Sequence, residues 1–169
     1  MPLPIIRDTR EKGEKNGWTF TDGFDPPPIV VDGTLTTGDY SIEGMEDVAA
    51  VERKEFQDFI GCLGAGRERF ERELCRARGF WRAGGFFVVV VEGPLSRLLA
   101  GDYRGALDPK AGEQTVLAFI QRYGVPFVFC LDRQHAERVC FDLLRHHARD
   151  FYGKWNGLTK AKTPKEIAK

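Results

Sequence analysis

Residues Phe86 to Val91 form an unbroken run of aromatic and β-branched side chains. A strand with one face in solvent alternates apolar and polar residues, whereas a strand covered on both faces reads as a continuous apolar run. The run is far shorter than the roughly 20 apolar residues needed to cross a bilayer. We therefore expect a sheet with helices on both faces and this strand at its centre.

Other segments of the chain indicate further strands and helices. Short apolar runs predict strands at 4–8, 29–31, 38–42, 48–54 and 127–131. Apolar residues at helical spacing predict helices at 55–63, 67–82, 112–123 and 136–147. Strands come first and then alternate with helices, which favours an α/β layer structure. The segment 11–28 is rich in Gly, Pro and charge, so we expect a loop over the edge of the sheet.

Length and charge set limits on the class of protein. With 169 residues, 42% of them hydrophobic, the chain has enough apolar material for one domain. The 25 basic residues balance the 25 acidic ones, so affinity for nucleic acid must come from local patches. The four cysteines lack a CxxC spacing, which favours reduced thiols in a cytosol. We expect no membrane or export segment, a domain over 1–152 and a flexible basic tail over 153–169.

The charged stretch 52–54 carries the chemistry. Because strand side chains alternate between faces, Glu52 and Lys54 project to one side and Arg53 to the other. Asp39 follows a glycine that permits close backbone approach, and an adjacent strand would bring this acid beside Glu52. Two carboxylates near a lysine predict a Mg²⁺ or Mn²⁺ site. Such an ion activates a bound water and neutralises charge on a phosphate, while the lysine orients the attacking water.

Several motifs occur together in one order along the chain. They are Asp8-Thr9-Arg10-Glu11, Gly38-Asp39-Tyr40, Val51-Glu52-Arg53-Lys54 with Asp58, and Gly66-Arg67 followed by the strand ending at Gly93. This ordered set resembles the XPF-type structure-specific endonucleases of the PD-(D/E)XK superfamily and spans about residues 5 to 93. The resemblance implies a restriction-endonuclease-like domain with a central mixed sheet flanked by helices.

The resemblance also implies an activity and a set of site residues. It implies a Mg²⁺- or Mn²⁺-dependent endodeoxyribonuclease of DNA repair or recombination that cuts one strand at branched, flap or fork DNA. The catalytic residues carried over by position are Asp39, Glu52, Lys54 and Asp58. The metal ligands are Asp8, Glu11, Asp39 and Glu52, and the DNA-binding residues are Arg10, Arg53 and Arg67. For Arg53, whose side chain faces away from Lys54, a structural ion pair is an equal alternative.

Other interpretations of the same residues stay open. The charged stretch 52–54, taken alone, is also typical of a strand edge protected against aggregation. The arginines between 67 and 82 alternate with glutamates, which fits either a solvated helix or a phosphate-binding face. A non-catalytic, nuclease-like DNA-binding subunit and an exonuclease or restriction-type enzyme are the alternative functions.

The assembly and location of the protein can also be predicted. The resemblance and the apolar stripe of the helix 136–147 suggest a homodimer, with a second subunit covering that stripe. No helicase or helix-hairpin-helix region is present in the sequence, so we expect a dimer, another protein or local basic residues to supply DNA grip. We expect a cytoplasmic protein of a prokaryote or phage-infected host rather than a nuclear one.

Overall fold

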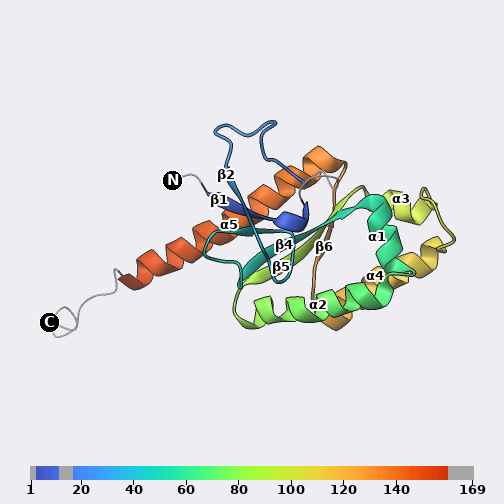
Figure 1. Ribbon diagram of the computed structural model, residues 1–169. Helices are drawn as coiled ribbons and strands as arrows, with labels where there is room; N and C mark the ends of the chain where they lie inside the picture. Colours follow the sequence, from blue (N-terminus) through green and yellow to red (C-terminus); the bar gives the residue numbers. More distant parts are fainter. Residues whose placement is uncertain (1–2, 12–16, 160–169) are drawn as a thin grey trace.

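A six-stranded mixed sheet forms the centre of the computed structural model, which describes residues 3–11 and 17–159 (Figure 1). The strand order is β2-β1-β3-β4-β5-β6. The strands are β1 Pro4–Asp8, β2 Ile29–Gly33, β3 Tyr40–Ile42, β4 Ala49–Glu55, β5 Phe86–Glu92 and β6 Phe127–Phe129. β3 runs antiparallel to both of its neighbours, whereas β4, β5 and β6 are parallel to one another. The predicted single α/β domain with a mixed sheet flanked by helices is confirmed.

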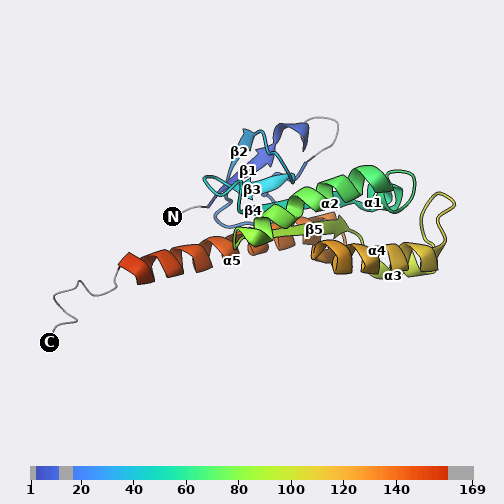
Figure 2. The same ribbon diagram turned by 90° about the horizontal axis from the view of Figure 1, so that it is seen from below.

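Helices cover both faces of this sheet (Figure 2). They are α1 Phe56–Leu63, α2 Arg67–Arg82, α3 Leu95–Ala100, α4 Pro109–Tyr123 and α5 Arg133–Thr159, with a short 3₁₀ turn at Thr9–Glu11. α5 lies against β3, β4 and β5 on one face, and α1 and α2 lie against β4 and β5 on the other. α4 packs against α1 and α2 on that face, and its Phe119 ring lies 6.4 Å from the Phe127 ring of β6.

Each face of the sheet has its own apolar core. On the α1–α2 face, phenylalanines from five elements interlock, with the Phe70 ring centroid 5.8 Å from that of Phe119. On the α5 face, Ala136, Cys140 and Leu144 are buried against the sheet. This is the stripe for which a second subunit was expected. The sheet of the same chain covers it, so the stripe supplies no reason to expect a dimer.

The segment 17–24 differs from the expected surface loop. Trp18 and Phe20 are fully buried on the α5 face, and the Trp18 ring stacks on Tyr40 at 4.9 Å between centroids. The expected loop is present, since 17–24 contains no helix or strand, but its two aromatic residues enter the core formed with β3 and α5 instead of staying at the sheet edge. Residues 12–16 lie outside the described residues.

The remaining differences concern position and length. β5 was expected at the centre of the sheet. It is an inner strand, paired on both sides, but it lies next to the edge, which is formed by the three-residue β6. α3 was not predicted, because a six-residue helix is too short to show apolar periodicity. α5 continues to Thr159, so residues 153–159 of the expected flexible tail are helical, and 160–169 lie outside the described residues.

Two further observations concern the cysteines and the helices. All four cysteines are free, three of them buried and Cys75 exposed. Among the described helices, none combines the length and hydropathy that a bilayer span requires.

Candidate active site

β4 divides its charged side chains between the two faces of the sheet. Lys54 points to the α2 side, where its ammonium lies 5.2 Å from the Phe70 ring centroid. Glu52, two residues earlier, shares that face and forms an ion pair with Lys54. Arg53 points to the opposite face, where its guanidinium lies 5.7 Å from the Trp18 ring centroid. The alternation expected from the sequence therefore holds along β4.

A close approach between chain segments sets Asp39 beside Glu52. Gly38 has a φ of +87°, and a Cβ there would lie 2.9 Å from the Ala50 Cβ. The Asp39 amide donates to the Val51 carbonyl at 2.9 Å, and an Asp39 carboxylate oxygen accepts from the Arg53 amide at 2.8 Å. Asp39 is thus fixed to the backbone of β4 on both sides of Glu52.

The two acids at this point are buried and close enough to influence each other. Burial, and next the negative charge of Glu11, raise the pKa of Asp39 to about 7. Burial, and next the neighbouring Asp39, hold the pKa of Glu52 well above its usual range. Burial disfavours the Lys54 ammonium, but Glu52, Glu73 and Asp39 outweigh it and raise the pKa of Lys54. A proton or a cation is therefore needed to stabilise this acid pair.

The acid pair has the properties of a divalent-metal site. One Glu52 carboxylate oxygen, Oε2, is buried and has no hydrogen-bond partner among the described residues. Such an atom costs free energy unless an ion or solvent satisfies it. Within 3–11 and 17–159 no three acidic, His or Cys side chains converge into a complete ligand set. Asp39 and Glu52 fit Mg²⁺ or Mn²⁺ as two hard oxygen ligands, since Mg²⁺ usually retains several waters.

Asp8 and Arg10 form a bound pair next to these acids. The Asp8 carboxylate accepts from the Arg10 guanidinium at 2.6 Å and from the Leu35 amide at 2.7 Å. Burial raises the pKa of Asp8, but the Arg10 and Leu35 hydrogen bonds outweigh it, and the net shift is downward. The Arg10 side chain is 61% exposed, and Asp39 and Glu52, after Asp8, contribute to its raised pKa. Arg10 is thus an accessible cation held near the acid pair.

Glu11 lies on the Arg53 side of β4. Its carboxylate accepts from the Arg53 guanidinium at 2.9 Å. The same guanidinium donates to Glu92 at 2.8 Å, and the Trp18 indole donates to Glu92 at 2.7 Å. Burial disfavours the Arg53 charge, but Glu92 and Glu11 raise the pKa of Arg53 overall. Arg53 therefore links Glu11, in the turn after β1, to Glu92, at the end of β5. This link lies on the face of β4 opposite to Glu52 and Lys54.

Two predicted site residues have no described bond to this centre. Asp58 is exposed in the first turn of α1. Arg67 begins α2, where its guanidinium lies 5.4 Å from the Phe119 ring centroid and 3.7 Å from Glu71. No hydrogen bond or ion pair among the described residues joins either side chain to Asp39, Glu52 or Lys54. Their catalytic and DNA-binding roles stay predictions.

Two carboxylates that sequence reasoning did not assign do contribute. Glu73 on α2 lies 3.9 Å from the Lys54 ammonium, and Glu92 ends β5 as the partner of Arg53. Glu73 follows Phe70 by three residues and so lies near the inward face of α2. That spacing is the only sequence signal for it, and alternating charges along the helix conceal it.

The site thus brings Asp39, just before β3, together with Glu52 and Lys54 of β4 in a mixed α/β sheet. The profile of the ERCC4 domain matches residues 24–143, more than half of the chain. The chain belongs to the ERCC4 domain family, a family of nucleases. The matched range contains Asp39, Glu52 and Lys54, whereas Asp8 and Arg10 lie before it.

Solved structures show the same fold. XPF from Aeropyrum pernix has a TM-score of 0.62 and 23% sequence identity over 84% of this chain. XPF from Aeropyrum pernix in complex with DNA has a TM-score of 0.64 and 21% identity over 88% of this chain. The alignments cover 60% and 66% of those XPF chains, so this chain corresponds to part of them. No match was found among curated protein sequences.

Proposed function

We propose that the protein is a Mg²⁺- or Mn²⁺-dependent DNA endonuclease that cuts one strand at branched, flap or fork DNA. The observation that carries the proposal is the buried pair Asp39 and Glu52 beside the Lys54 ammonium, with one Glu52 oxygen lacking a partner. Membership of the ERCC4 domain family and the DNA bound to the similar XPF support it.

Each side chain of the centre has a role that follows from its position. Asp39 and Glu52 would hold the metal ion through their carboxylates. When bound, the ion supplies Lewis-acid stabilisation of charge on the phosphate and lowers the pKa of a water. Lys54 orients the attacking water or the transition-state oxygen with its ammonium. The exposed guanidinium of Arg10 contacts a phosphate, and Asp8 fixes its position through paired hydrogen bonds.

Branched DNA as substrate and a homodimer as the active form are parts of the same proposal. The family resemblance supports both. A dimer would be twice the 19.1 kDa of one chain, a difference that light scattering resolves at micromolar concentration.

The test uses labelled flap, fork, junction and plain duplex DNA. Wild-type protein is expected to nick one strand near the branch with Mg²⁺ or Mn²⁺ and not with excess chelator. Asp39→Asn should abolish cleavage and leave branched-DNA binding within about threefold, because a contact made only in the transition state need not contribute to ground-state affinity.

The control is Asp150→Asn, which removes one exposed carboxylate from α5, away from the acid pair, and is expected to cleave like the wild type. Full cleavage by Asp39→Asn, or full cleavage in chelator, contradicts the proposal. DNA binding without any metal-dependent cleavage by the wild type indicates a non-catalytic binding subunit. First cuts at duplex ends or at a fixed sequence indicate an exonuclease or a restriction-type enzyme.

A further inference from the structure

A second carboxylate reaches the Lys54 ammonium from α2. Glu73 lies 3.9 Å from this ammonium, and its side chain is 23% exposed. Phe70, about one helical turn earlier, has its ring centroid 5.2 Å from the same ammonium. Lys54 is therefore held between Glu52 on its own strand and two side chains of the helix that packs over it.

Glu73 does not form the ion pairs that its own helix offers. Arg69 and Arg76 lie at the spacings at which helix side chains commonly pair with it. In the part of the chain that the structure describes, no ion pair joins Glu73 to either arginine. After burial and the charge of Asp39, the charge of Glu73 also raises the pKa of Glu52. The Glu73 carboxylate therefore acts on the acid pair rather than on the surface of α2.

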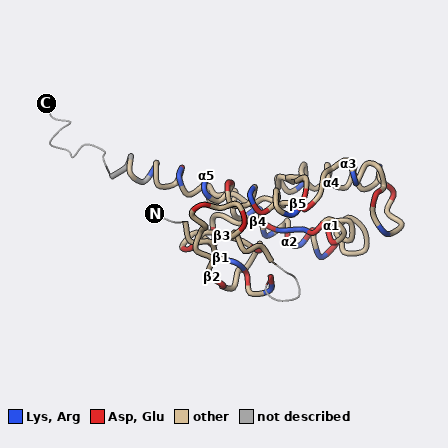
Figure 3. The backbone as a smooth tube through the Cα atoms, turned by 90° about the horizontal axis from the view of Figure 1, so that it is seen from above, with Lys and Arg blue, Asp and Glu red and all other residues tan. Residues whose placement is uncertain are grey.

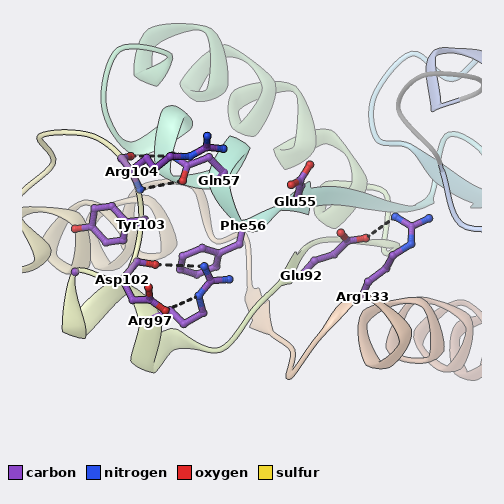
Figure 4. Close-up of a pocket in the computed structure, with 10 residues that line it drawn as sticks. Glu55, Phe56, Gln57, Glu92, Arg97, Asp102, Tyr103, Arg104 and Arg133 are labelled. Atoms are coloured by element: carbon purple, nitrogen blue, oxygen red, sulfur yellow. Dashed lines mark hydrogen bonds and ion pairs between the residues drawn. The ribbon is translucent and has the colours of Figure 1, made fainter.

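The carboxylates that end β4 and β5 lie elsewhere. Glu55 immediately follows Lys54 and, by strand alternation, projects to the other face of β4. It lines an open pocket at the carboxyl ends of the two strands together with Glu92 (Figure 4). Among the described residues, Glu52 and Glu73 are the only carboxylates in ion pairs with Lys54.

Glu52 cannot serve a divalent ion and the Lys54 ammonium equally well. In the metal-free protein Lys54 neutralises Glu52, which is one of the two proposed metal ligands. When Glu52 ligates a divalent ion, it no longer needs the charge of Lys54, and two cations this close repel each other. Without a second anion the ammonium would turn to solvent and leave the position from which it orients the attacking water. Glu73 is already within ion-pair distance to supply that anion.

We propose that Glu73 is a positioning residue that retains the Lys54 ammonium in the site when Glu52 ligates the metal ion. Lys54 then exchanges its Glu52 partner for Glu73 and stays beside the acid pair. This inference rests on the proposed function. It adds to the centre a residue of α2 that acts through Lys54 and does not ligate the ion itself.

The first test measures Mn²⁺ binding by calorimetry in the absence of DNA. Glu73→Gln is expected to weaken Mn²⁺ binding by about tenfold, because the ammonium then has no partner other than Glu52 and competes with the ion. Lys54→Gln removes this competitor and should bind Mn²⁺ at least as tightly as the wild type. In the Lys54→Gln background, Glu73→Gln should change the affinity by less than about threefold, since a residue that acts through Lys54 loses its effect there.

Cleavage of flap DNA supplies the second readout. Glu73→Gln is expected to lower kcat by about tenfold and to leave KM within about twofold of wild type, because Lys54 acts in the transition state and not in ground-state binding. Glu73→Asp keeps the charge on a shorter side chain. It should lie between the wild type and Glu73→Gln in both kcat and Mn²⁺ affinity, and it tests the inference even if Glu73→Gln fails to fold.

The matched control is Glu68→Gln. It removes the same charge from an exposed position of α2 that lies about 140° around the helix from Glu73. Its kcat and its Mn²⁺ affinity are both expected to stay within about twofold of wild type, since surface substitutions away from a site have small effects.

Three results would overturn the inference. They are unchanged Mn²⁺ affinity in Glu73→Gln, an equal loss of affinity with and without Lys54, and an equal loss in Glu68→Gln. The second result would make Glu73 itself a ligand of the ion. The proposed function fails separately, through cleavage that does not depend on Asp39 or on metal. Because the Mn²⁺ measurements contain no DNA, coupling between Glu73 and Lys54 can be present in a protein that cuts no DNA, and absent from one that does.

Discussion

Asp39 is a buried carboxyl group whose protonation depends on its neighbours. Its pKa is about 7 in the folded protein, because burial and the negative charge of Glu11 disfavour its ionisation. The ordinary value is 3.8, so between about pH 4 and pH 7 the folded protein keeps a proton that the unfolded chain has lost. This group thus favours the folded state below about pH 4, and its contribution is lost as the pH rises through 7.

We therefore predict that the metal-free protein loses stability between pH 5 and pH 7, by up to about 1.4 kcal/mol per pH unit from this group. Asp39→Asn should flatten that slope, because its amide does not ionise. Urea unfolding in EDTA at pH 5, 6, 7 and 8 measures both slopes. Asp58→Asn, which changes an exposed carboxyl group, should keep the wild-type slope. Parallel slopes for wild type and Asp39→Asn would contradict this assignment.

Arg53 is a single residue that we expect to stabilise the fold through two buried ion pairs. Its side chain is only 8% exposed and bridges Glu11 and Glu92, which are 6% exposed each. Arg53→Ala would remove the buried cation that Glu11 and Glu92 share, although Arg133 still pairs with Glu92, and breaking a buried pair costs about 3 to 5 kcal/mol. We expect a loss of that size in urea unfolding. Arg7→Ala, which breaks the more exposed pair with Asp32, should cost about 1 kcal/mol or less. Equal losses of unfolding free energy would show that the buried Arg53 ion pairs stabilise the fold no more than the Arg7–Asp32 pair does.

The segment before β3 determines how accurately Asp39 meets β4. Gly38→Ala would put a methyl group 2.9 Å from the Ala50 Cβ at a φ of +87°. We expect it to destabilise the fold by more than about 1 kcal/mol and to reduce kcat, because Asp39 would be displaced. Gly44→Ala is the matched control, with a φ of +80° and no atom within 4 Å of the added carbon. If both variants lose the same stability and keep full kcat, close approach at Gly38 does not position Asp39.

Most elements follow from local sequence patterns, and so does part of the site. The β4 alternation and the glycine before Asp39 were enough to bring Asp39, Glu52 and Lys54 together, because strand geometry fixes those relations. Burial of Trp18, and the contact of Glu73 with Lys54, depend on how distant segments pack. No periodicity in 11–28 or 67–82 encodes such contacts, which explains why they were missed.

At the scale of the whole molecule, α5 serves two purposes along its length. Its first half covers one face of the sheet, and the last of its residues buried there is Ala148. Its second half projects past the sheet (Figure 1), and basic positions recur along the helix (Figure 3). Phe151 and Tyr152 are 45% and 50% exposed, so neither side chain adds much to the core.

We predict that a chain ending at residue 152 folds with a free energy of unfolding within about 1 kcal/mol of the full chain, because terminal residues without burial contribute little. A chain ending at residue 143 removes Leu144 and Ala148, which are 0% and 4% exposed. It should lose at least about 2 to 5 kcal/mol, the range for deleting one large buried side chain. Urea unfolding of the three lengths measures this. A large loss at 152 would mean that the projecting half of α5 belongs to the folded domain, and the boundary predicted there would be wrong.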